Sequence, residues 1–324
     1  MSFLKKREVE RLKSEIYKGY GVHHCVIGVR DLEIMKSFYR NLLELNNVFV
    51  EFPDGESEAL SELIRTAHPR NASIFLSHET GGIIVGLTQM IYPIPRAIRK
   101  DFRYGDIGVA KLTIAASDLE RLYEEMGDRL NCYSKPKSVM VPDWGEYRFM
   151  YCRDPEGNII ELISGDKVPV RSRFGSVRWL GVSVTDLPRS LAFYQKYLGF
   201  DTTVIGTHEQ FSGLVDEVSG SRQTTVRSCV LASSEGDGMV ELFEVMKPRG
   251  RSIPFLTRWG DFGYTQVCLN GKAGLDIYKI SDYFEKEGME FLSGPQLMHD
   301  EKGGGFFYIK DPDGIPLEFL VFNQ

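Results

Sequence analysis

The chain has 324 residues, which is enough for two domains of roughly 150 residues that each bury a hydrophobic core. Its 42% hydrophobic and 26% charged residues are typical of a folded globular protein. The net charge of −6 leaves no basic surface for nucleic acid, and no apolar stretch approaches the roughly 18 residues of a membrane span, so we expect a small-molecule ligand and neither nucleic acid nor a membrane as partner.

The first predicted element is an N-terminal helix within residues 1–20. Leu4, Val9, Leu12 and Ile16 recur at roughly helical spacing among charged residues, without the continuous apolar core of a secretory signal peptide. We expect this helix to pack on the first domain, with a homodimer contact as the alternative. Five scattered cysteines are typical of reduced core thiols, so we expect a cytoplasmic protein.

A strand, a helix and three further strands follow. Residues 22–29 form an apolar stretch with β-branched side chains, which predicts a strand. Asp31 stands at the N-cap position of the next helix, where its carboxylate can accept hydrogen bonds from the free amides. The next strand-like stretches lie at 46–52, 73–77 and 83–90.

The same order of elements recurs from Lys111, from Trp179 and from Gln266, so the chain contains four βαβββ modules. Asp118 and Asp186 stand at the helix caps of the second and third modules. In the fourth module a glycine-containing segment replaces the aspartate, and the sequence indicates no clear cap.

Two similar turns mark the ends of the two halves, which are related by a shift of about 155 residues. The segments 154–157 (DPEG) and 311–314 (DPDG) combine a proline, which presets the first turn dihedral, with a glycine that supplies positive φ. Each therefore predicts a tight hairpin. Residues 166–176 are typical of a linker, which predicts domains at 21–165 and 177–324.

These patterns together resemble the vicinal oxygen chelate superfamily, over about residues 20–322. The resemblance rests on a first-strand signature and on the carboxylates after the two turns: His24, Ile27, Val29, Asp31, Phe38, Tyr39, Glu161 and Glu318. The superfamily includes glyoxalase I, bleomycin-resistance proteins and extradiol ring-cleaving dioxygenases. The resemblance implies an α+β fold of two tandem domains, each of two paired βαβββ modules that form a cupped, barrel-like sheet with the site in its hollow.

The resemblance also assigns metal-ligand positions, one on the first strand and one on the last strand of each paired module. In the first half they hold His24, Gly86, Lys111 and Glu161. Imidazole and carboxylate suit Zn²⁺, Fe²⁺ or Mn²⁺, but glycine has no donor atom and a lysine cation opposes a metal. The alternative is that Lys111 replaces the charge of a metal and pairs with Glu161 or with a substrate carboxylate.

In the second half the corresponding positions hold Trp179, Glu241, Gln266 and Glu318. Three oxygen donors favour a harder cation such as Mg²⁺ or Mn²⁺. Trp179 cannot bind a metal, but it could fill the metal cavity or stack on an aromatic ligand. The cofactor is therefore one divalent ion (Zn, Mn, Fe or Mg) or none, and the candidate metal ligands are His24, Glu161, Glu241, Gln266 and Glu318.

The same positions supply the candidates for chemistry. Glu161 or Glu318 would act as a general base or metal ligand, with Lys111 as a further catalytic group. The candidate substrate contacts are Trp179, Tyr151 and Tyr308. The two tyrosines precede the closing hairpins, where they could face the hollow or belong to the core.

Two hypotheses about function follow. The first is an enzyme of lyase, isomerase or dioxygenase type that acts on a small aromatic or carbonyl-bearing molecule. The second is a metal-free protein that sequesters such a compound. Extradiol ring cleavage is less favoured, because it requires two histidines and a carboxylate around Fe²⁺ and only His24 occupies a ligand position.

Overall fold

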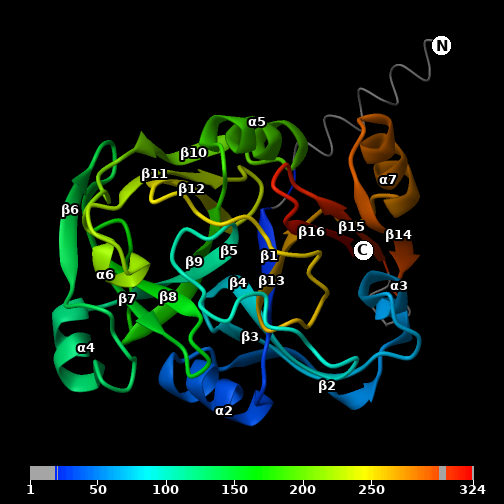
Figure 1. The fold of residues 1–324 in the computed structure, drawn as a ribbon, viewed down its shortest axis with the longest axis horizontal. Coiled ribbons are helices and arrows are strands. Elements are labelled where there is room, and N and C mark those ends of the chain that lie inside the picture. The colour runs from blue at the N-terminus through cyan, green and yellow to red at the C-terminus, as the bar shows by residue number, and fades with distance from the viewer. Residues whose placement is uncertain (1–18, 20, 299–303, 323–324) are drawn as a thin grey trace.

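The computed structural model describes residues 19, 21–298 and 304–322, and the predicted N-terminal helix lies outside these residues. The described strands form two eight-stranded sheets (Figure 1). In spatial order the first sheet contains β14 (Phe291–Leu297), β15 (Gly305–Lys310), β16 (Pro316–Val321), β13 (Gly263–Asn270), β1 (Val22–Gly28), β4 (Gly81–Tyr92), β3 (Arg70–His78) and β2 (Asn47–Glu56). The second contains β10 (Thr202–His208), β11 (Thr225–Ala232), β12 (Met239–Lys247), β9 (Phe174–Ser183), β5 (Gly108–Ala116), β8 (Ile159–Ser164), β7 (Gly145–Arg153) and β6 (Lys137–Val141).

Each of the four predicted modules is present, with one main helix after its first strand. These helices are α2 (Leu32–Ser37), which continues as the π-helical turn η1 (Phe38–Leu42), α4 (Leu119–Met126), α5 (Leu187–Tyr197) and α7 (Ile277–Lys286). Three short helical segments lie in the connections: η2 (Glu58–Leu60), α3 (Ser61–Ile64) and α6 (Asp216–Ser219). No helix among the described residues is long and apolar enough to span a membrane.

The predicted caps are confirmed. The carboxylates of Asp31, Asp118 and Asp186 each accept a hydrogen bond from the amide three residues later. In the fourth module the cap that the sequence left open is Asp276, which accepts from the amides of the next helix, α7. Both predicted turns join the last two strands of their halves, and Gly157 has the expected positive φ of 91°.

The modules pair in an order that the sequence did not predict. Strand β1 of module one pairs antiparallel with β13 of module four, and β5 of module two pairs antiparallel with β9 of module three. We call these the outer-module sheet (β1–β4 with β13–β16) and the inner-module sheet (β5–β12). The α+β class with paired modules is confirmed, but the expectation that each half encloses its own hollow is wrong. We propose the boundaries 21–165 and 177–324 as those of the two sequence repeats. They do not coincide with the two sheets, because each sheet takes one module from each half.

Reciprocal ion pairs join the two halves and follow the internal repeat. The guanidinium of Arg96 lies 2.7 Å from Asp261, and that of Arg251 lies 2.6 Å from Asp106. Both aspartates are buried, and each also accepts a backbone amide hydrogen bond from its arginine. Charged groups held this way fix the orientation of one half against the other.

Candidate functional site

The hollow of the outer-module sheet contains a cavity of about 710 Å³. Aromatic side chains form much of its wall, including Phe49, Phe75, Trp259 and Phe306. Its floor is polar. Such a combination of an apolar wall with a few convergent polar groups is typical of a small-molecule site.

Three of the predicted ligand positions meet at this floor. His24 Nε2 lies 3.4 Å from Glu318 Oε2, and the side-chain amide of Gln266 donates to the same oxygen at 2.7 Å. The Gln266 amide also lies 3.3 Å from the hydroxyl of Tyr308. The predicted partnership of His24 with Glu161 is therefore wrong, because β1 lies beside β13 and not beside β5.

The strand register explains this convergence. His24 on β1 is opposite Cys268 on β13, Cys268 is paired with Glu318 on β16, and Glu318 with Tyr308 on β15. The four residues form one row across four neighbouring strands, and paired residues in a sheet project to the same face. Gln266 precedes Cys268 by two residues and therefore faces the same hollow.

The fourth ligand position of this set is Gly86 on β4. It has no donor atom, and an aromatic ring occupies the space beside it: a Cβ built on Gly86 would lie 2.6 Å from Cε1 of Phe75. The Phe75 ring also meets His24 edge to face, with 5.3 Å between ring centroids. Phe75 thus fills the space that a ligand side chain at position 86 would need.

A second histidine borders the same floor. His23 Nδ1 lies 2.9 Å from His24 Nδ1, and His23 lines the cavity. Strict alternation along a strand predicts that His23 faces away from His24. A β-bulge between Val22 and His24 breaks the alternation and turns His23 toward the cavity.

Cys268 was missed by the sequence analysis. Its donor atom and those of His23 and His24 all lie within 4.8 Å of one another, and its side chain is fully buried. Burial, with the nearby Glu318 carboxylate as a further cause, raises the pKa of the Cys268 thiol well above its usual range. The only signal in the sequence is its position two residues after Gln266 on the same strand.

The other predicted ligand positions meet in the hollow of the inner-module sheet. Lys111 Nζ lies 2.6 Å from Glu161 Oε2 and 2.8 Å from Glu241 Oε2. The predicted contact between Lys111 and Glu161 is therefore present, and Glu241 joins it from the other half. Trp179 completes this set and is 1% exposed, as is Lys111.

The charges in this cluster are strongly coupled. Burial by itself disfavours the ammonium of Lys111, but the two carboxylates more than offset this and raise its pKa. Burial raises the pKa of Glu161, opposed by Lys111 and reinforced by Glu241. The ammonium of Lys111 thus stays charged between the two carboxylates.

Aromatic packing closes the inner-module hollow. The Trp179 ring packs against Trp144 and Tyr147, with centroid distances of 6.3 and 6.4 Å. The hydroxyl of Tyr151 lies 3.5 Å from Lys111 Nζ, and Tyr151 is also buried. For Tyr151 this burial favours the core role that the sequence left open, and for Trp179 it favours filling the hollow over stacking on a ligand. Tyr308 is equally buried but lines the outer-module cavity.

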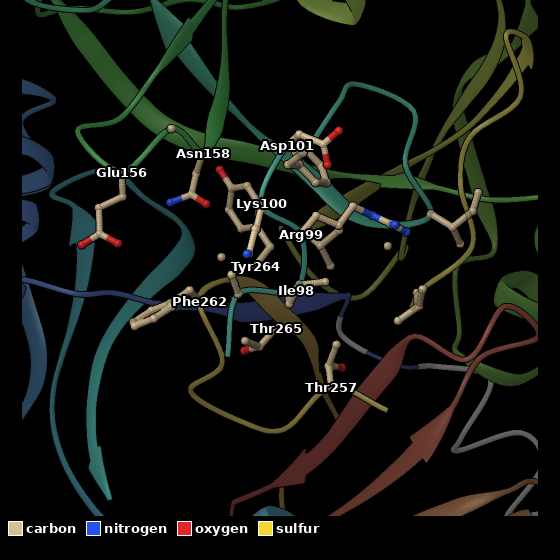
Figure 2. Close-up of a pocket in the computed structure, with 18 of the residues that line it drawn as sticks. Ile98, Arg99, Lys100, Asp101, Glu156, Asn158, Thr257, Phe262, Tyr264 and Thr265 are labelled. Atoms are coloured by element: carbon tan, nitrogen blue, oxygen red, sulfur yellow. The ribbon is translucent and has the colours of Figure 1, made fainter. Parts of the chain in front are cut away.

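A separate cavity of about 390 Å³ lies where the two halves meet. Figure 2 shows the Lys100 amino group directed into the space between the labelled residues, while the guanidinium of Arg99 turns away from it. Arg99 is held by the backbone carbonyls of Arg251 and Ser252. None of the predicted ligand positions lines this cavity. The site with convergent donors is therefore the outer-module hollow.

Comparisons with known proteins agree with this geometry. A family model described as the Glyoxalase/Bleomycin resistance protein/Dioxygenase superfamily matches residues 21–162 and 176–319. No curated protein sequence matches the chain significantly.

Among solved structures, a mutant of glyoxalase I from Zea mays is similar with a TM-score of 0.65 and 18% identity, over 97% of this chain and 96% of that chain. Another crystal structure of glyoxalase I from Zea mays gives a TM-score of 0.60 and 17% identity, over 93% of this chain and 92% of that chain. A Bacillus subtilis protein provisionally described as a dioxygenase gives 0.54 and 10%, over 94% and 86%. At these identities the likeness concerns the fold alone.

Proposed function

The chain belongs to the Glyoxalase/Bleomycin resistance protein/Dioxygenase superfamily, and from this premise we propose that the outer-module hollow is the active site of a metal-dependent enzyme for a small aromatic or carbonyl-bearing molecule. One observation carries the proposal. Donor side chains at the family's ligand positions converge: His24 and Glu318 line the floor of an open cavity, and the buried Gln266 contacts Glu318. At the inner-module positions Lys111 stands where a metal would have to be.

The residues at the floor fit a divalent ion. An imidazole nitrogen, an amide oxygen and a carboxylate are accepted ligands for Zn²⁺, Fe²⁺, Mn²⁺ or Mg²⁺. Gln266 would have to rotate its amide, whose nitrogen now donates to Glu318, and present its oxygen, because the nitrogen has no lone pair to share. Three protein ligands with glycine in the fourth place leave positions open for substrate. Such an ion would polarise a carbonyl or hydroxyl oxygen of the substrate.

The surrounding side chains have separate roles in this proposal. Burial, with Glu318 as the next cause, raises the pKa of Tyr308 well above its usual range, so its hydroxyl stays protonated and can donate to a substrate oxygen. Glu318 holds the charge and can accept a proton. Phe75 and Phe306 exclude water from the reacting groups and contact an apolar part of the substrate.

A metal-free binding protein is the second candidate, and one observation favours it. The carboxylate of Glu318 already has polar partners without an ion, because the amide of Gln266 donates to it and His24 lies beside it. The cavity could then hold an aromatic ligand by shape and apolar contact alone.

Metal analysis separates the two candidates. Protein purified without added metal should contain, or bind on titration, about one divalent ion per chain. His24→Ala and Glu318→Gln should each weaken this binding at least about tenfold. Glu161→Gln is the matched control, because it removes a carboxylate at the corresponding place of the closed inner-module hollow. A protein that binds aromatic compounds but no divalent ion would be the sequestering alternative.

A further inference from the structure

We propose that Cys268 is a fourth protein ligand of this metal centre and makes it selective for borderline ions such as Zn²⁺, Fe²⁺ and Co²⁺ over Mg²⁺ and Mn²⁺. The inference rests on the proposed function and deepens it, because it concerns the same site. Four observations support it: the position of Cys268 in the sheet, the reach of its repeat counterpart, the missing donor at Gly86, and the charge balance of a buried centre.

The register places Cys268 between two of the candidate ligands. Its strand β13 lies between β1 and β16, and Cys268 is paired with His24 on one side and with Glu318 on the other. The donor atoms of His23, His24 and Cys268 lie within 4.8 Å of one another. Two donors that share one ion through bonds of about 2.1 and 2.3 Å are at most about 4.4 Å apart, so His23, His24 and Cys268 need only small side-chain movements. Glu318 lies outside this group and adjoins it through His24, with 3.4 Å between Nε2 and Oε2.

The inner-module sheet shows that a side chain at the position of Cys268 can reach the glutamate carboxylate on the last strand of its module. The repeat counterpart of Cys268 is Thr113, since the two are 155 residues apart, as are Trp179 and His24. Thr113 is paired with Trp179 and with Glu161, in the same row. Its hydroxyl donates to Glu161 Oε2 at 2.8 Å, the oxygen to which Lys111 also binds. In the outer-module sheet the same position carries a sulfur atom.

Cys268 also replaces a donor that is missing elsewhere. Gly86 has no ligating atom, and Phe75 blocks the approach of a larger side chain from that strand. With Cys268 the set becomes one imidazole, one amide oxygen, one carboxylate and one thiolate, and a substrate would then bind as a fifth ligand from the cavity side. Thiolate and imidazole favour Zn²⁺ and related ions, whereas an all-oxygen set would favour Mg²⁺ or Mn²⁺.

The charge balance favours the same assignment. Cys268 is fully buried and Glu318 is 7% exposed, and a divalent ion held by a single carboxylate would leave one net positive charge beside these buried groups. A thiolate together with the Glu318 carboxylate neutralises the ion. Binding then releases one proton from the Cys268 thiol to the solvent, and the sulfur lone pair forms the bond to the metal.

A titration of the full-length protein with Co²⁺ tests the inference. A thiolate bound to Co²⁺ gives an intense charge-transfer absorption in the near ultraviolet, which nitrogen and oxygen ligands do not. We expect this absorption in the unaltered protein, in proportion to the Co²⁺ bound and to about one proton released per ion. In Cys268→Ser the absorption should disappear, and the preference for Zn²⁺ over Mn²⁺ should fall at least about tenfold.

Cys25→Ser is the matched control, because Cys25 is equally buried on the neighbouring strand β1 but lies in the apolar core. It should keep the absorption. Co²⁺ binding without the absorption in the unaltered protein would overturn the role of Cys268 and leave the proposed function standing. No Co²⁺ binding at all would overturn both. Because the decisive spectrum is that of the unaltered protein, the result does not depend on whether Cys268→Ser folds.

Discussion

His24 and Glu318 come from the first and the last strand of the described chain, and their side chains meet with 3.4 Å between Nε2 and Oε2. The contact exists because module one pairs with module four. If each half formed its own sheet, His24 would lie near Lys111 instead. The positive charge of the Lys111 ammonium would then oppose the binding of a metal ion beside His24. The exchange of modules therefore sorts the candidate ligands into one set suited to a metal and one set that has its own cation.

The pairing of modules can be tested by cross-linking. Val22 and Leu269 are paired residues on β1 and β13, and a cysteine pair at these positions should form a disulfide on oxidation. The two halves should then stay together in denaturing gels without reductant after cleavage at an engineered protease site in residues 171–173. Val22→Cys with Ile114→Cys is the control, because Ile114 is the repeat counterpart of Leu269 on β5. Both of its cysteines lie in the N-terminal fragment, so a cross-link there is read as the loss of two free thiols from that fragment. Cross-linking of that control pair would contradict the observed sheet order.

Lys111→Met should be strongly destabilising. The change leaves the buried Glu161 and Glu241 without their shared cation, and removal of one partner from a buried ion pair costs about 3–5 kcal/mol. Chemical denaturation measures the loss in the free energy of unfolding. Lys36→Met is the control, because the surface pair of Lys36 with Glu51 should be worth at most about 1 kcal/mol. Equal losses in the two variants would show that the Lys111 cluster is not a stabilising unit.

Gly86→Ala should reduce stability by about 1–3 kcal/mol, because the added methyl group would overlap the Phe75 ring. Phe75→Leu should relieve the overlap, so the double variant should lose less than the two single variants together. Thermal unfolding of the four proteins gives this coupling. Gly206→Ala is the control, since a Cβ there meets no atom within 4 Å. Additive losses would mean that Phe75 moves away without cost.

The closing turns predict a dependence of stability on pH. Burial raises the pKa of Asp311 to about 7, despite hydrogen bonds from the backbone amides of Ile315 and Asp313. In the unfolded chain the pKa is close to 3.8, so between these values the folded state binds more protons than the unfolded state. The contribution of Asp311 to stability is therefore complete below about pH 4 and is lost as the pH rises to about 7.

Asp311→Asn should remove this slope, which amounts to about 1.4 kcal/mol per pH unit within the window. Denaturation of both proteins at several pH values between 4 and 8 checks it. Asp154→Asn should give the same sign with a window that ends about one unit lower, because burial raises the pKa of Asp154 to about 6. A variant and an unaltered protein with parallel pH profiles would contradict the assignment.

The sequence determined the features that depend on local chemistry or on the internal repeat. Asp31 caps its helix because a short carboxylate before a helix satisfies free amides whatever surrounds it. Gly157 has positive φ because the turn requires it. The repeat placed the candidate ligands on the correct strands and facing the correct side, since side-chain alternation fixes the face once the register is known.

Only the tertiary structure decided which ligands meet. The four modules carry the same pattern of strands, so pairing one with two or one with four buries equivalent strand edges, and periodicity cannot distinguish these arrangements. Contacts between distant residues make the difference, such as the hydroxyl of Tyr39 donating to Asp154 and Arg96 binding Asp261. The place of Cys268 beside His24 follows from that pairing, because β1 lies far from β13 in the sequence, whereas Glu318 on β16 belongs to the same module as Cys268.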